Sequence, residues 1–152
     1  MAVKPIPQGQ HNIVPHLSIR NGECTKAIEF YKKAFGAEDE NPPMKSPDGK
    51  IVHAALRIGD SSFYLADEMG PSVAPGGFCV HLWCNDVDAT WGRATKAGAN
   101  VKMPLANMFW GDRYGQLTDP YGHTWSLATH VEDVPPEQMG KRFQEWMAKN
   151  KP

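Results

Sequence analysis

The chain repeats one short pattern, and this repetition limits its fold more than any other feature of the sequence. Residues His16–Asn21 precede a segment with helical spacing, and residues His81–Asn85 precede another. Each helical segment ends in Gly-Ala, at Gly36-Ala37 and again at Gly98-Ala99. The sequence therefore predicts two copies of one module, with a histidine at the same place in each first strand.

The first copy reads as a strand, a helix and three further strands. Residues 23–35 carry apolar side chains at helical spacing and are followed by Gly36, a residue that favours a helix end. The expected strands are 12–20, then 38–44 with an interruption at Pro42-Pro43, and then a hairpin of 51–58 and 62–66 that turns around Gly59-Asp60.

The second copy repeats this order after residues 68–77, a stretch rich in helix and strand breakers that we interpret as a linker. A final helix over 135–149 is predicted from its two leading prolines and its apolar stripe. The expected class is α+β, with one βαβββ module over 12–67 and another over 78–132. The elements expected in the second module are a strand at 78–84, a helix at 87–97 and strands at 101–105, 109–117 and 124–128.

Composition narrows the classes of partner. The 152 residues are 41% hydrophobic and 22% charged, as in ordinary globular proteins. A formal net charge of −1 predicts neither nucleic-acid nor acidic-membrane binding, and no apolar run approaches the ~20 residues of a membrane-spanning helix. The three cysteines lack metal-site or disulfide spacing, which predicts a reduced, cytoplasmic protein.

Motifs throughout the chain resemble those of the vicinal oxygen chelate superfamily, and within it the PhnB-like glyoxalase/bleomycin-resistance proteins. This resemblance implies two βαβββ modules that enclose a cleft for a small molecule, and it implies a homodimer. The motifs that carry it are residues 27–37, 47–54, 58–61, 65–68, 81–82, 86–89, 111–113 and 119–125.

The resemblance also nominates metal ligands. Metal-dependent members similar to glyoxalase I place a histidine or glutamine in the first strand and a glutamate in the fourth strand of each module. His16 and His81 match the first-strand positions, whereas Tyr64 and Ser126 stand at the glutamate positions. Two imidazoles without a carboxylate form a weak site for Zn, Ni, Fe or Mn. We therefore assign no cofactor and expect an incomplete metal site.

Four residues are expected to bind the ligand. Tyr64 and Ser126 should face the same cavity as the two histidines, although ordinary strand polarity explains them equally well. Trp110 could stack on a ligand, and Arg113 could bind a carboxylate or phosphate through both guanidinium nitrogens. A turn fixed by Asp112 and Arg113 is the alternative for that segment. The sequence identifies no catalytic residue.

The remaining histidines and cysteines have structural explanations. His53, His123 and His130 follow turns or lie in strands, and Cys79 and Cys84 lack neighbours that would activate a thiolate.

Three functional hypotheses remain open. The first is a small-molecule-binding protein without a complete glyoxalase metal site. The second is a metal-dependent lyase or isomerase acting on substrates with vicinal oxygens. The third is an interaction module, and its support is the amphipathic C-terminal helix.

Overall fold

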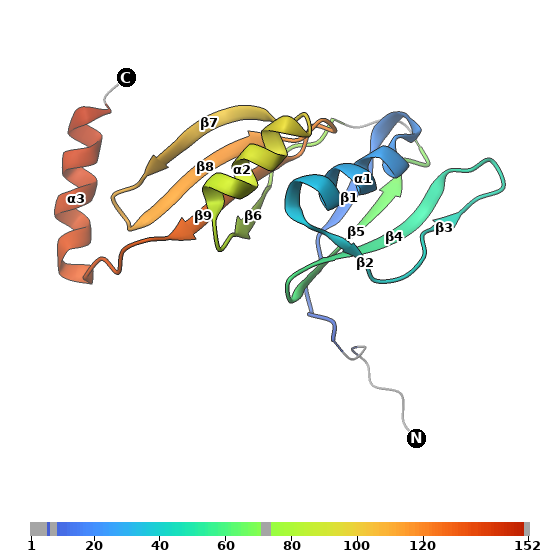
Figure 1. The fold of residues 1–152 in the computed structure, drawn as a ribbon, viewed down its shortest axis with the longest axis horizontal. Helices are drawn as coiled ribbons and strands as arrows, with labels where there is room; N and C mark the ends of the chain where they lie inside the picture. Colours follow the sequence, from blue (N-terminus) through green and yellow to red (C-terminus); the bar gives the residue numbers. More distant parts are fainter. Residues whose placement is uncertain (1–5, 7–8, 71–73, 151–152) are drawn as a thin grey trace.

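The computed structural model describes residues 6, 9–70 and 74–150, in which each half of the chain forms a mixed sheet with a helix on one face (Figure 1). In the first half, strand order is β1-β5-β4-β2, with β3 also paired to β4. Its elements are β1 (His16–Ile19), a 3₁₀ turn (Arg20–Gly22), α1 (Cys24–Phe35), β2 (Glu38–Asp39), β3 (Met44–Lys45), β4 (Ile51–Ile58) and β5 (Ser61–Asp67).

The second half has the same topology, with strand order β6-β9-β8-β7. Its first strand pairs in parallel with its last strand, as in the first half, because a helix connects the first strand to the antiparallel part of the sheet. The elements are β6 (Cys79–Trp83), α2 (Val87–Lys96), β7 (Asn100–Asn107), β8 (Asp112–Thr118), β9 (Thr124–His130) and the terminal helix α3 (Pro136–Lys149). The predicted α+β fold with two βαβββ modules is therefore confirmed.

The predicted strands differ from the observed ones in three places. The expected strand 12–20 forms only over β1, after Pro15. The expected strand 38–44 becomes the separate pieces β2 and β3, with Pro42-Pro43 between them. The expected strand 109–117 begins only at Asp112, because Gly111 adopts φ 101° and a Cβ there would lie 2.0 Å from the carbonyl oxygen of Glu132. A turn at that point therefore requires glycine.

Helix α1 obtains its N-terminal cap from a distant strand. The side chain of Glu23 at the cap position accepts no hydrogen bond from the backbone amides of the helix. Instead, the buried carboxylate of Asp67 at the end of β5 accepts from the Cys24 amide at 2.9 Å and from the Ile51 amide at 2.8 Å. Asp67 thus fixes the helix against its sheet by satisfying a free amide of the first turn.

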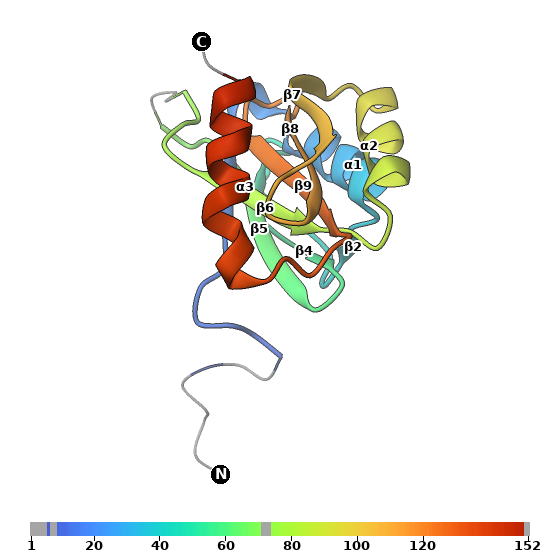
Figure 2. The ribbon, with the colours of Figure 1, turned by 90° about the vertical axis from the view of Figure 1, so that its left-hand side faces the viewer.

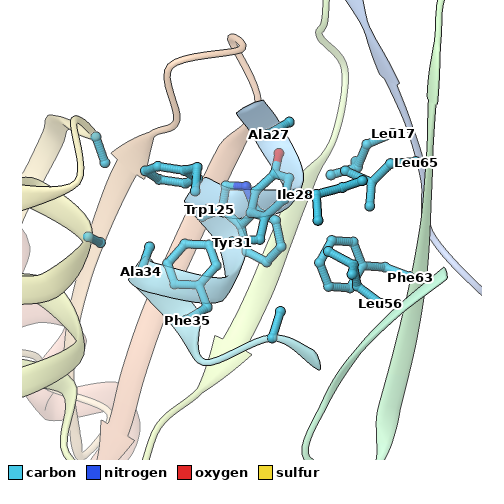
Figure 3. Packing of buried hydrophobic residues seen from close by; sticks show 14 of the residues in the cluster. Leu17, Ala27, Ile28, Tyr31, Ala34, Phe35, Leu56, Phe63, Leu65 and Trp125 are labelled. Carbon is cyan, nitrogen blue, oxygen red and sulfur yellow. The ribbon is translucent and has the colours of Figure 1, made fainter. Parts of the chain in front are cut away.

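The core lies between the two helices and the two sheets. Trp125 of β9 is almost fully buried, and its ring centroid is 4.6 Å from that of Phe35 and 5.4 Å from that of Tyr31, both on α1. Phe63 of β5 approaches the same indole at 5.8 Å, so side chains of both modules meet around it (Figure 3). The modules therefore share one hydrophobic core.

A buried carboxylate joins the modules at the edge of this core. Asp119, in the turn between β8 and β9, accepts from the Tyr31 hydroxyl at 2.6 Å and from the Trp125 indole nitrogen at 2.9 Å. The Tyr121 and His123 amides also donate to it, each at 2.9 Å. Burial alone would raise the pKa of Asp119, but the His123 imidazole and the hydrogen bonds together lower it.

Helix α3 stands apart from α1 and α2 (Figure 2), and it lies beyond the end of the second module (Figure 1). None of its described residues is buried. Phe109 packs on Phe143 and Trp146 with ring centroids 5.4 and 5.7 Å apart, and Arg142 pairs with Glu132 at 2.6 Å. Within the described ranges, no helix is long and apolar enough to cross a membrane.

Candidate functional site

The candidate ligand site lies on the face of the second sheet that the helices do not cover. Alternation along β8 directs Gly115 and Leu117 toward the helices, so Tyr114 and Gln116 face the other way. We call this surface the His81 face. Its members are His81, Trp83, Trp110, Tyr114, Gln116 and Ser126.

His81 is held in place by Ser126. The two residues are register partners on β6 and β9, and His81 Nδ1 lies 2.8 Å from Ser126 Oγ. Ser126 is buried beneath the imidazole, whereas His81 is exposed. Among the described residues, none bonds to the other ring nitrogen, Nε2. Partial burial lowers the pKa of His81 against a smaller opposite effect of Asp112, so the ring is neutral at pH 7.

Aromatic rings surround this histidine. The Tyr114 ring is nearly parallel to the imidazole, at an interplanar angle of 17° and a centroid distance of 6.1 Å. Trp83 meets His81 edge to face at 4.7 Å, and Trp110 meets Tyr114 in the same way at 5.5 Å. Gln116 donates to the Tyr114 hydroxyl at 2.8 Å. The face therefore offers flat apolar surfaces beside a neutral imidazole.

A cavity of about 560 Å³ adjoins the His81 face, between β6 and the turn that joins β4 to β5. Its volume lies within the range of small-molecule sites. His81 and Trp83 line it from one side, and Ile13, Pro15 and Phe63 line it from the other. The cavity thus combines residues of both modules.

The matching face of the first sheet has a different character. His16 and Tyr64 are register partners, as His81 and Ser126 are, and His53 completes a cluster with ring centroids 5.0 to 6.4 Å apart. The Tyr64 hydroxyl donates to Gln10 Oε1 at 3.2 Å. Burial, and next the charge of His53, lower the pKa of His16.

The donor set does not fit a glyoxalase-type metal. His16 and His81 line separate cavities, that of His16 being about 480 Å³. Tyr64 and Ser126, the register partners of the two histidines, offer a hydroxyl where the site would need a carboxylate. In the described ranges, no group of three or more His, Cys, Asp or Glu residues is placed to hold a metal ion. A divalent ion needs more and stronger donors than one chain brings together here.

The structure separates the residues that the sequence nominated as ligand contacts. Ser126 and Trp110 both lie at the His81 face, and Tyr64 lies on the first sheet beside His16. Arg113 lies on the helix side of β8, where its guanidinium bonds both oxygens of Asp88 at 2.6 and 2.7 Å. The structure therefore does not bring Arg113 together with Trp110.

Sequence reasoning did not nominate Gln116 or Trp83 as ligand contacts. The period of two along β8 carried the signal: residues 112, 114 and 116 share one face, and residues 113, 115 and 117 share the other. Asp112 and Trp110 contact each other at one end of the face, where the indole nitrogen donates to the carboxylate at 2.7 Å.

Comparisons with known proteins agree with this architecture. Residues 13–127 match the family model of the glyoxalase/bleomycin resistance protein/dioxygenase superfamily. An uncharacterised protein of Mycobacterium bovis is 44% identical over 130 residues, which cover 79% of this chain and 84% of that protein. Protein YjdN of Escherichia coli is 30% identical over 135 residues, covering 74% and 91% of the two chains.

Solved structures show the same fold. TioX from a Micromonospora species superposes with a TM-score of 0.61 at 26% identity, covering 79% of this chain and all of TioX. The PhnB protein of Bacillus cereus superposes with a TM-score of 0.66 at 19% identity, covering 78% and 99% of the two chains.

Proposed function

Because the chain belongs to the glyoxalase/bleomycin resistance protein/dioxygenase superfamily, we propose that it binds a small planar molecule in the cavity beside His81. The observation that carries this proposal is the imidazole itself. Ser126 fixes its Nδ1 at 2.8 Å, while its exposed edge borders a cavity of about 560 Å³. A neutral ring with a fixed orientation can bind one polar atom of a ligand without first losing rotamer freedom.

The surroundings of His81 favour a flat ligand. Tyr114 and Trp83 present aromatic surfaces, and stacked or edge-to-face rings stabilise a complex by about 0.5–1.5 kcal/mol beyond the area that they bury. The six residues of the His81 face include no acid, lysine or arginine, and the carboxylate of Asp112 at the end of the face is buried and already bonded to Trp110 and His130. The ligand class is therefore an uncharged or weakly charged aromatic or heteroaromatic compound.

Quenching of tryptophan fluorescence tests this proposal, because Trp83 and Trp110 lie on the face itself. The probes are a panel of small, uncharged or weakly charged heteroaromatic compounds, such as quinoline and quinoxaline. We expect His81→Ala to raise the Kd of a quenching compound roughly tenfold, the effect of one lost hydrogen bond. Trp83→Phe should remove much of the quenching.

His53→Ala is the matched control, since it removes an imidazole from the other sheet. It should leave the Kd unchanged. Equal affinity in wild type and His81→Ala, or equal losses in both histidine variants, would contradict the proposed site.

We further propose that the protein is a homodimer in which α3 packs against a second copy. Phe143 and Met147 on this helix are 46% and 44% exposed, and α3 buries none of its described residues within the chain. Apolar side chains repeated along one helix face usually mark a contact surface. Light scattering after gel filtration should give twice the chain mass, and Phe143→Lys should give the monomer mass. A wild-type monomer would contradict this proposal.

We also propose a cytoplasmic location. The support is that Cys24, Cys79 and Cys84 are all free, as is usual where thiols are kept reduced. Fractionation of the source cells, with the protein detected by antibody, tests it, and recovery outside the cytoplasm would contradict it.

A further inference from the structure

A second cavity, of about 680 Å³, lies on the helix side of the molecule between α1 and α2. The two helices run next to each other there (Figure 1). We call this cavity the α1–α2 groove. It is lined by Thr25, Lys26, Glu29, Phe30, Lys33, Arg93, Lys96, Ala97 and Tyr121. It shares no residue with the cavity beside His81.

Positive charge is concentrated in the groove although the whole chain has a net charge of −1. Four of the nine lining residues are lysine or arginine, and Glu29 is the one acid among them. Glu29 is already paired with Lys32 at 3.7 Å, outside the lining set. The groove therefore carries an excess of about three positive charges at pH 7.

Most of these cations lack an anionic partner. Lys33 and Lys96 form no ion pair within the described ranges, and Arg93 donates to the neutral hydroxyl of Thr90 at 3.1 Å. Lys26 is paired with Glu23 at 3.2 Å. Unpaired cations that line one concave surface attract anions, because their fields add inside the groove.

Helix ends explain only part of this charge. Lys33 lies in the last turn of α1, and Arg93 and Lys96 lie in the last turn of α2, where cations stabilise the helix dipole. Each helix end supplies only about half a negative charge, so two ends offset about one cation. Lys26 lies in the first turn of α1, where the dipole disfavours a cation. Unbalanced positive charge therefore remains.

The floor of the groove is aromatic. Phe30 is buried under it, and Tyr121 is half-buried, with the two ring centroids 6.1 Å apart in an edge-to-face arrangement. A ligand in the groove would meet cations at the rim and aromatic carbon at the base. We infer that the α1–α2 groove binds an organic phosphate that joins a planar ring to at least two negative charges, as in a nucleoside diphosphate.

Isothermal titration calorimetry with three probes tests the two parts of this ligand separately. ADP carries both parts, pyrophosphate carries only the charge, and adenosine carries only the ring. ADP should bind more tightly than either pyrophosphate or adenosine. Its affinity should fall when the salt concentration is raised from 50 to 300 mM, because salt screens the attraction between the charges. Pyrophosphate binding as tightly as ADP would overturn the assignment of a planar ring, and no ADP binding would overturn the site.

The double variant Lys33→Ala/Lys96→Ala locates the site. It should raise the Kd of ADP roughly tenfold, because each exposed charge contact contributes a modest share of the affinity. The control is Lys45→Ala/Lys141→Ala, which removes two exposed lysines of β3 and α3 outside the groove lining. The control should retain wild-type affinity, and His81→Ala should retain it too. Equal losses in both double variants, or no loss in the first, would overturn the assignment to the groove.

Discussion

Replacing Tyr31 by phenylalanine tests how the two modules are held together. The substitution removes one hydroxyl, which donates to Asp119 at 2.6 Å across the boundary between the modules. The ring that remains keeps its contacts with Trp125 and Phe63, both at a centroid distance of 5.4 Å. The change in stability should therefore report the hydrogen bond and not the packing.

The expected cost follows from the state of Asp119. The carboxylate is 2% exposed, so water cannot replace the lost donor. Hydrogen bonds to charged groups contribute about 1.5–3 kcal/mol. Asp119 keeps three other hydrogen-bond donors, of which the Trp125 indole nitrogen donates to the same oxygen as Tyr31. We therefore expect Tyr31→Phe to lower the free energy of unfolding by about 2 kcal/mol.

A lower pH should reduce this difference in stability between wild type and Tyr31→Phe. The folded-state pKa of Asp119 lies below its unfolded value, so its ionised form stabilises the fold above about pH 4, and that stabilisation is lost as the pH falls through the lowered pKa. Tyr31 is one cause of the lowering. The gap between wild type and Tyr31→Phe should thus be full at pH 7 and should narrow below about pH 4.

Urea denaturation followed by circular dichroism, at one fixed protein concentration, measures the effect. Tyr114→Phe is the matched control, because its hydroxyl lies on a half-exposed ring and accepts from Gln116. We expect the control to cost less than about 0.5 kcal/mol. A Tyr31→Phe variant within 0.5 kcal/mol of wild type at pH 7, or a cost that grows in acid, would refute the reasoning.

Three further changes test other contacts. Asp67→Ala should lower the free energy of unfolding by about 3 kcal/mol, because it leaves the buried Cys24 and Ile51 amides without an acceptor. Asp67→Asn should restore part of the lost stability in the same urea assay. Hydrogen bonds from His130 to Asp112 and Asp133 raise the pKa of His130. Its stabilising effect is therefore present below about pH 6.5 and is lost as the pH rises through the raised pKa. His130→Gln should lower the melting temperature more at pH 5.5 than at pH 9. Elemental analysis of protein purified without chelator should give the same metal content for wild type and His81→Ala, and a stoichiometric metal lost only in the variant would contradict the argument from donors.

Much of the fold could be predicted because the repeated modules depend on local patterns. A strand period of two and a helix period of 3.6 indicated the order of elements within each module. The resemblance to the superfamily, and not periodicity, placed Tyr64 and Ser126 beside His16 and His81, and the register places both pairs side by side.

Relations between modules could not be predicted in the same way. The contact of Tyr31 with Asp119 joins residues 88 positions apart, and no periodicity connects them. Trp125 of β9 fills the shared core together with Tyr31 and Phe35 of α1, and no pattern along the chain links these three residues. These contacts depend on how two helices and two sheets pack, which is decided by shape and not by local pattern.

The expected role of Arg113 in ligand binding stays a prediction, and the position of its side chain argues against that role. Its side chain points to the helix side of β8, and its two hydrogen bonds to Asp88 already use the fork that would bind a carboxylate. Spacing along the chain placed Arg113 near Trp110, but Trp110 lies in the turn before β8, and Arg113 lies on the helix side of that strand. Within a strand, side chains share a face only when their positions differ by an even number.

The difference between the two sheets follows from one pair of equivalent positions. Tyr64 lies beside His16, and its hydroxyl bonds Gln10. Ser126 at the matching position is small enough to lie buried beneath His81, and it leaves the outer edge of that imidazole uncovered. The two modules thus share a backbone plan and differ at this position in the size of one side chain, a phenol against a hydroxymethyl group. The proposed ligand is placed beside His81 because Ser126 fixes the orientation of that imidazole at the border of a cavity.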